Sequence, residues 1–221
     1  MDGSTTVRDS RAAQARYVWL GLALVFCAIE ALLILADRGL VGSPLWRPLA
    51  YQYGGFWAGL LHSWTPNYGL QPVAMFFSYM ILHAGWQHLL GNVLALGWLG
   101  AQLERSLSAG RLAALFVISG VGGGIGFGLL SASPRPMVGA SGAIMGLIAV
   151  WIAADAQALR AEGASKRRVY GMVLWRTTLI AALNALAWVL EAGALAWETH
   201  LGGFVAAALA MALVPALRPG A

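Results

Sequence analysis

The chain has 221 residues, of which 59% are hydrophobic and only 10% charged, and its net charge is +5. Soluble domains carry about 25% charged residues, so this composition excludes an ordinary soluble protein and indicates a bundle of membrane-spanning helices. About six spans of ~20 residues fit into this length, which leaves no room for a large soluble domain. The basic residues then report topology rather than a nucleic-acid partner, and we expect no cofactor.

The N-terminal part is predicted to contain a short tail and the first span. Residues 1–16 are polar and hold three arginines, which predicts a cytoplasmic tail. The first span is expected from Tyr17 to Ala36 and is too long for a signal-peptide core. Its cysteine, Cys27, is the only one in the chain, which excludes a disulfide framework and a thiolate metal site; we expect it in the core. Glu30 is costly in lipid and should face protein, water or an interface, in a structural or, less often, a functional role.

A long loop is predicted over residues 37–87. It is rich in Trp, Tyr, Gly and Pro, and because tryptophan and tyrosine favour the membrane interface, we expect the loop to lie in the outer leaflet. The stretch from Pro72 to Ala84 is apolar but shorter than the ~20 residues of a span, so it is predicted to be interfacial.

The other spans are predicted at His88–Leu103, Arg111–Leu130, Val138–Ala154, Val169–Leu190 and Leu195–Val214. The spans and their loops form one domain, residues 17–215, followed by a short cytoplasmic tail, residues 216–221. The third span is crowded with glycines, which predicts close helix packing; they are Gly120, Gly122, Gly123, Gly124, Gly126 and Gly128.

The distribution of basic residues predicts that both termini are cytoplasmic. Ten basic residues fall in the inner segments, namely Arg8, Arg11, Arg16, Arg105, Arg111, Arg160, Lys166, Arg167, Arg168 and Arg218. Three fall in the outer segments, namely Arg38, Arg47 and Arg135, and Arg176 lies within a span. This asymmetry agrees with the positive-inside rule.

A serine and a histidine are predicted to lie at similar depth in the outer part of the membrane. Ser141 stands in Gly139-Ala140-Ser141-Gly142 at the start of the fourth span, and His200 lies near the start of the sixth. Taken alone, such a motif is more typical of helix packing, and such a histidine of hydrogen bonding. Since both spans run inward, however, the two side chains should be neighbours, and serine becomes a nucleophile when a base removes its proton.

Two further polar residues begin the second span from the same side. His88 and Asn92 are four residues apart and share a helix face, and both can donate hydrogen bonds to an oxyanion. Alone they are more simply an interfacial histidine and a helix-bonding asparagine, but together with Ser141 and His200 they favour a joint site. No acid completes a triad: Glu198 lies roughly opposite His200 on its helix. We therefore expect a dyad whose imidazole is oriented by packing.

These residues resemble the rhomboid family of intramembrane serine proteases. The stretch from His83 to Asn92 is similar to the family's His-plus-Asn signature, residues 139–142 resemble its G-x-S-G, and His200 with Gly203 resembles its final-span motif. Order and spacing agree over about residues 72–215. The resemblance implies an all-α, six-span bundle with a long membrane-associated first loop. It also implies cleavage of single-span membrane proteins within or beside their transmembrane segments.

The same resemblance implies a role for each matched residue. Ser141 is the expected nucleophile, His200 the general base, and His88 and Asn92 the oxyanion donors, together with backbone amides near Ser141. The expected supporting backbone positions are Gly139, Gly142 and Gly203. By the same likeness His83 is structural, and Glu104 forms a helix-end ion pair, for which Arg105 or Arg111 is the expected partner.

The chain departs from the family pattern at three places. Ala74-Met75 stands where the first loop often has Trp-Arg, Met145 stands where an aromatic often packs on the histidine, and Ala207 replaces a common glycine. None of these changes removes a reacting group.

Two other functions are compatible with the chain. It could be a catalytically inactive rhomboid-like protein that binds transmembrane segments, or a small transporter, whose polar groups would be spread over the membrane depth. The preferred hypothesis remains a protease in a bacterial inner membrane with its site open to the outer face. The sequence predicts no oligomeric state.

Overall fold

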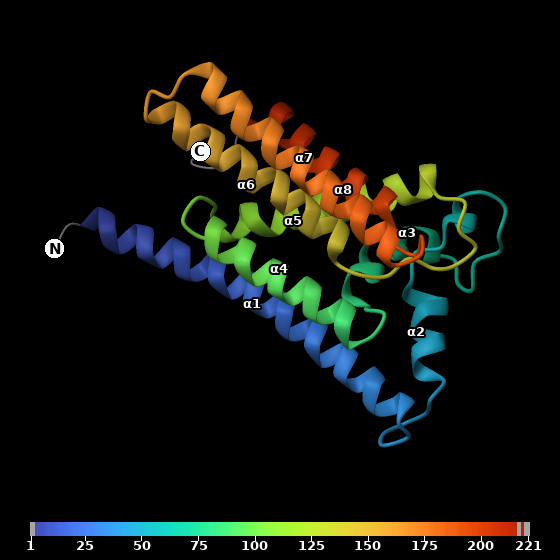
Figure 1. Ribbon diagram of the computed structural model, residues 1–221. Coiled ribbons are helices and arrows are strands. Elements are labelled where there is room, and N and C mark those ends of the chain that lie inside the picture. Colours follow the sequence, from blue (N-terminus) through green and yellow to red (C-terminus); the bar gives the residue numbers. More distant parts are fainter. Residues whose placement is uncertain (1–2, 216–217, 219–221) are drawn as a thin grey trace.

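The computed structural model describes residues 3–215 and 218 and shows an all-α protein (Figure 1). The long helices are α1 (Gly3–Asp37), α4 (Trp86–Leu103), α5 (Ala109–Leu130), α6 (Ser141–Ala161), α7 (Lys166–Leu190) and α8 (Trp197–Leu213). The loop after α1 contains α2 (Trp46–Gly54), η1 (Ala58–Leu61), α3 (Gln71–Ser78) and η2 (Tyr79–Ile81). Within the described residues the β structure is a single isolated bridge between Phe56 and Met137.

The six long helices correspond to the six predicted spans. Four of them, α5, α6, α7 and residues 12–37 of α1, are long and apolar enough to cross a membrane by length and composition. The other two, α4 and α8, have 18 and 17 residues, slightly fewer than the ~20 of a typical span. The predicted all-α membrane fold is thus confirmed, and the count of six spans fits it loosely.

Two helices extend beyond the predicted spans. The first helix begins at Gly3 instead of Tyr17, and its polar first turns contain alanine, glutamine and arginine, which favour helix. The fourth span ends at Ala161 instead of Ala154, because the residues that follow are again mostly strong helix formers. Hydropathy marks where a helix leaves the apolar layer, and a polar continuation of the helix carries no such signal.

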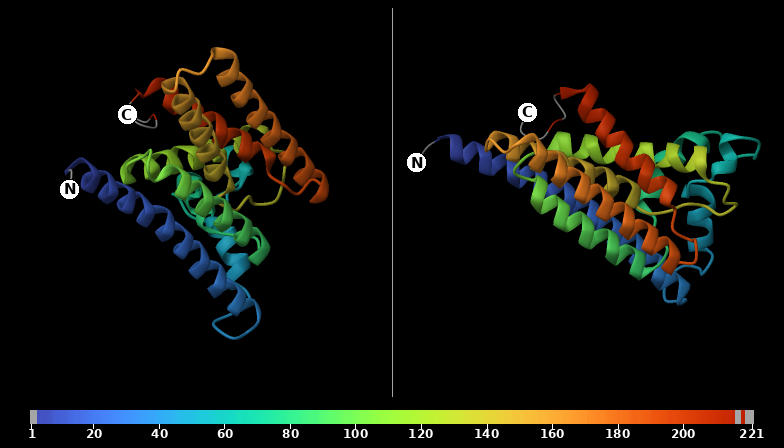
Figure 2. Two further views of the ribbon diagram at one scale, coloured as in Figure 1. Left: turned by 60° about the vertical axis from the view of Figure 1, so that its left-hand side comes forward. Right: turned by 45° about the horizontal axis from the view of Figure 1, so that its top comes forward.

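The glycines of α5 allow it to pack closely against α8, as predicted. A Cβ added at Gly122 would lie 2.2 Å from the Cβ of Ala206, and one at Gly126 would lie 2.5 Å from the Glu198 carbonyl oxygen. Helix α5 also packs against α6 and α1. In contrast, α7 lies on the outside of the bundle (Figures 1 and 2), and Val169 is its buried residue.

One end of the bundle carries the first loop and the starts of three helices. In Figures 1 and 2, α4, α6 and α8 begin near α2 and α3, whereas α1 begins and α8 ends at the opposite end. The side chains at the starts of α4, α6 and α8 therefore gather at a single end of the molecule.

The first loop is folded and anchored although it lacks the Trp-Arg pair. The Ser78 hydroxyl donates to the Gly54 carbonyl at 2.7 Å, which ties α3 to α2. The Tyr79 hydroxyl donates to the Gly120 carbonyl of α5, also at 2.7 Å. Met75, which replaces the arginine of the family pattern, is fully buried. The loop is thus joined to the bundle through other contacts.

Two predictions about single side chains were wrong. Cys27 is exposed instead of buried in the core, because α1 packs against the bundle with one face only and a small apolar side chain is tolerated on the other. Glu104 pairs with Arg16 at 2.5 Å instead of Arg105 or Arg111. The hydrogen bond from Arg16 lowers the pKa of Glu104, and Trp19 contributes to the shift. Arg16 therefore belongs to a helix–helix contact and not to a free tail.

Candidate active site

Ser141 is the first residue of α6, and the segment that leads to it is held by the first loop. Met137 exchanges two backbone hydrogen bonds of 2.9 Å with Phe56, and the Gly139 amide donates to the Tyr79 carbonyl at 2.9 Å. Gly139 has a φ of +123°, which glycine adopts without strain. The N–H groups in the first turn of α6 have no partners within the helix, so Ser141 lies at a positive helix end.

His200 lies in the first turn of α8 within hydrogen-bond distance of Ser141. Its Nε2 is 2.8 Å from the Ser141 Oγ, although the two residues are 59 positions apart in sequence. The pair is brought together by a backbone contact between α6 and α8, since a Cβ on Gly203 would lie 1.9 Å from the Gly142 carbonyl oxygen. The two glycines thus set the distance between the serine and the histidine.

The other ring nitrogen of His200 has a partner that the sequence analysis missed. The Oδ1 of Asn184, on α7, lies 2.5 Å from the His200 Nδ1. We expected packing alone to orient the imidazole, so this hydrogen bond corrects that expectation. The available signal was a single polar residue in the apolar second half of α7, about two turns from the end that meets the start of α8.

His88 faces the same site from α4. The Ala84 amide donates to the His88 Nδ1 at 3.3 Å, and because an N–H group can only donate, the proton of neutral His88 must be on Nε2. A Cβ on Gly139 would lie 2.8 Å from this Nε2, so the ring lies beside Gly139, two residues before Ser141. His88 is therefore available as a donor.

Asn92 lies one helical turn further from the loop end. It is buried, and its Nδ2 donates to the His88 carbonyl at 2.9 Å. The structure thus brings together Ser141, His200 and His88, with Asn92 adjacent to His88 but outside the set of residues that lines the cavity described next.

A cavity of about 950 Å³ opens over Ser141. Its walls come from α4, α6, α8, the end of α7 and the segment between α5 and α6. The polar side chains that line it include Gln87, His88, Ser131, Ser133, Ser141 and His200. A peptide segment in this cavity would meet the serine, the histidine and the His88 donor together.

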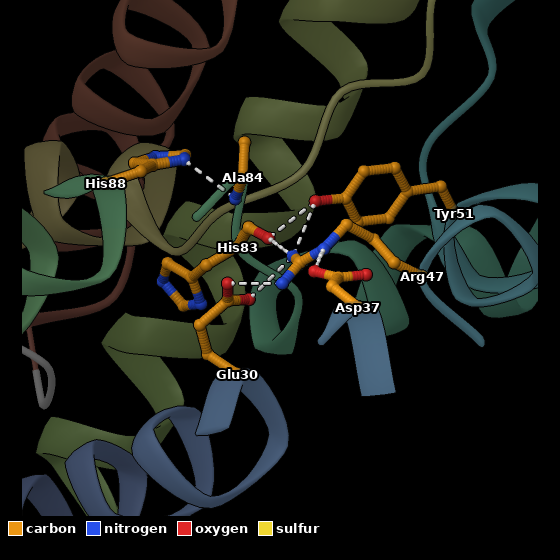
Figure 3. A network of polar contacts seen from close by, with 7 residues as sticks. All are labelled: Glu30, Asp37, Arg47, Tyr51, His83, Ala84 and His88. Atoms are coloured by element: carbon orange, nitrogen blue, oxygen red, sulfur yellow. Dashed lines mark hydrogen bonds and ion pairs between the residues drawn. The ribbon is translucent and has the colours of Figure 1, made fainter. Parts of the chain in front are cut away.

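A cluster of charged groups supports the loop that holds His88 (Figure 3). Arg47 of α2 contacts Glu30 at 2.9 Å and Asp37 at 2.7 Å, both on α1, and donates to the His83 carbonyl at 3.1 Å. The Tyr51 hydroxyl donates to the same carbonyl at 2.7 Å. Burial by itself would lower the pKa of Arg47, but its hydrogen bonds to Glu30, Tyr51 and Asp37 outweigh burial and raise it.

This cluster binds the carbonyl side of the peptide group whose N–H contacts His88. The His83 carbonyl belongs to the same peptide group as the Ala84 N–H, which contacts the His88 ring (Figure 3). The His83 ring lies 5.4 Å from that of His88. Burial, with a contribution from His88, lowers the pKa of His83 to about 4, so His83 is neutral at pH 7. Glu30 has the structural contact that we preferred for it.

Among the side chains that the structure describes, no group of three or more His, Cys, Asp or Glu residues is placed to hold a metal ion.

The family match and the similar curated proteins point to the same family. The rhomboid domain family matches residues 71–216. Rhomboid protease GluP of Bacillus subtilis is 28% identical over 142 residues, which cover 64% of this chain and 26% of that protein. RHOMBOID-like protein 5 of Arabidopsis thaliana is 44% identical over 68 residues, 30% of this chain and 22% of that protein.

The matched lengths limit what these relatives imply. Uncharacterized protein Mb1372 of Mycobacterium bovis is 30% identical over 147 residues, 62% of this chain and 57% of that protein. The alignments span about a quarter of the length of the first curated relatives. The family match nevertheless covers more than half of this chain and includes α4 to α8. The chain therefore belongs to the rhomboid family of integral membrane proteins.

Proposed function

We propose that this protein is an intramembrane serine endopeptidase that uses Ser141 and His200. The observation that carries the proposal is the 2.8 Å contact between the His200 Nε2 and the Ser141 Oγ in a cavity that also contains His88. A serine is activated as a nucleophile by such a base. A rhomboid-like protein that only binds transmembrane segments would not need this contact.

The proposed reaction follows from the positions of these groups. His200 accepts the Ser141 proton as Oγ attacks the scissile carbonyl carbon, and the carbonyl oxygen becomes an oxyanion. The His88 Nε2–H, the Asn92 amide and the first backbone N–H groups of α6 would stabilise that charge. Imidazolium then protonates the leaving amine as the C–N bond breaks. Water, deprotonated by the same histidine, releases the acyl group from Ser141.

The expected substrates are single-span membrane proteins. The proposed catalytic residues lie at the ends of α4, α6 and α8 that the charge distribution places outside, so the site should open to the outer face of a bacterial inner membrane. A helical peptide bond is shielded by its own hydrogen bonds and side chains. Segments that unwind near their outer end, with small residues at the cut and Gly or Pro nearby, are therefore the best substrates.

The test compares Ser141 with another serine of the same cavity. Purified wild type and the Ser133→Ala variant should react with a fluorophosphonate probe and cleave a single-span reporter in co-expression, whereas Ser141→Ala should do neither. Ser133 is the matched control because it lines the same cavity while its hydroxyl accepts a hydrogen bond from the Arg135 amide. Absence of labelling and cleavage in the wild type, with a panel of reporters, would leave the inactive binding protein as the better explanation.

A further inference from the structure

We propose that Asn184 is a positioning residue for catalysis, which extends the serine and histidine to a Ser141–His200–Asn184 unit. This inference rests on the proposed function. It assigns the orientation and tautomer of His200 to a hydrogen bond from a neighbouring helix instead of to packing. Asn184 is 16 residues before His200 and is the partner that the structure gives to the Nδ1 of this histidine.

The orientation of the Asn184 amide is fixed independently of His200. Its Nδ2 donates to the Ile180 carbonyl at 3.0 Å, one turn earlier on α7. A carbonyl oxygen only accepts hydrogen bonds, so the amide atom that faces it must be the nitrogen. The atom that faces His200 is therefore Oδ1, which only accepts.

This orientation determines the tautomer of the histidine. Because Oδ1 is an acceptor, the proton of neutral His200 must be on Nδ1, and the lone pair of Nε2 then points to the Ser141 hydroxyl. That is the form that can accept the serine proton. The opposite tautomer would place the lone pair of Nδ1 against that of Oδ1, so neither acceptor would have a donor and that tautomer is disfavoured.

The surroundings offer little else to select the tautomer. Asn184 and His200 lie at the edge of a second cavity of about 540 Å³ between α6, α7 and α8. Its lining is mainly apolar and includes Met145, Ile180, Ala181 and Phe204. The Met145 sulfur, at the position where an aromatic ring is common in the family, is 3.9 Å from the Asn184 Nδ2. A flexible thioether orients an imidazole weakly, so Asn184 supplies the directional contact.

The hydrogen bond between His200 and Asn184 also persists after proton transfer. When His200 has taken the Ser141 proton, both ring nitrogens carry hydrogens, and the Nδ1–H still donates to Oδ1. A hydrogen bond from a charged donor is stronger than one between neutral groups. The contact therefore stabilises the imidazolium more than the imidazole, and its effect should appear in kcat more than in KM.

Two substitutions at this position separate positioning from packing. Asn184→Leu has nearly the same shape and suits an apolar cavity but removes the acceptor, whereas Asn184→Asp keeps an acceptor oxygen opposite Nδ1. Hydrogen-bond partners that orient metal-ligating histidines typically contribute 10–100-fold, and we expect an effect of the same order at a catalytic histidine. We expect Asn184→Leu to lower kcat and the rate of fluorophosphonate labelling by about 10–100-fold. Its KM and thermal midpoint should stay unchanged, while Asn184→Asp should restore most of the rate.

The control is Thr178→Ala, an exposed polar residue of the same helix, which should behave like wild type. If Asn184→Leu is as active as wild type while Asn184→Asp is impaired, the residue only packs and the inference is overturned, with the proposed function intact. If wild-type protein is not labelled and does not cleave, the proposed function itself fails and this inference fails with it.

Discussion

The two polar side chains of α4 differ in how directly they face the serine. His88 lines the cavity, and its ring lies beside Gly139. Asn92 uses one of its two amide hydrogens on the His88 carbonyl, which leaves the other available. If both residues stabilise an oxyanion, they act only on charge that develops in the transition state.

We therefore predict that His88→Ala and Asn92→Ala each lower the rate of substrate cleavage without abolishing it. The loss of one oxyanion donor typically costs about 10²–10³ in kcat, and KM should change little. Steady-state kinetics on a purified reporter would measure both constants, with the exposed Leu90→Ala on the same helix as control. Full activity in both variants would show that the oxyanion is held by backbone amides alone.

Among the elements, α6 and α8 meet without an intervening side chain. At the Gly142–Gly203 contact there is no space for a methyl group, because a Cβ on Gly203 would lie 1.9 Å from a backbone oxygen. Any residue larger than glycine must push the two helices apart. Since the start of α6 carries Ser141 and the start of α8 carries His200, such a shift separates the reacting pair.

We predict that Gly203→Ala abolishes cleavage and lowers the thermal midpoint in detergent. Overpacking of this kind typically costs about 1–3 kcal/mol. Gly91→Ala on α4 is the matched control, because an added Cβ there has no heavy atom within 4 Å, and alanine favours helix by roughly 1 kcal/mol. The prediction fails if Gly203→Ala cleaves as fast as Gly91→Ala.

At the scale of the whole molecule, the arrangement of the helices agrees with the prediction that both termini lie on the same side of the membrane. Helix α1 begins and α8 ends at the same end of the bundle (Figure 1), and the ten-to-three asymmetry of basic residues given above favours the cytoplasm for that end. Reporter fusions after Ala221 should therefore be active only with cytoplasmic reporters. A C-terminus outside the cell would contradict the shared outward position of Ser141, His88 and His200.

The sequence predicted those features that depend on polarity along one helix. The apolar spans, the glycine face of α5 and the shared end of Ser141 and His200 follow from hydropathy and from alternating helix direction. It did not predict contacts that depend on how helices rotate around the bundle. Asn184 contacts His200 from a neighbouring helix, and Arg16 contacts Glu104, 88 residues later. The residue pattern within one helix does not specify either contact.

Because synthesis runs from the N-terminus, Glu30 is made before its partner Arg47. Arg47 follows only 17 residues later, and its second contact, Asp37, is ten residues before it. A buried carboxylate without a partner is strongly destabilising. Here the opposite charges are close in sequence, so the carboxylates of α1 can pair with the arginine of α2 once both helices have left the ribosome. Ser141 and His200 are 59 residues apart, and both are synthesised after every member of this charged cluster. All the residues that anchor the loop before His88 therefore precede the nucleophile in the order of synthesis.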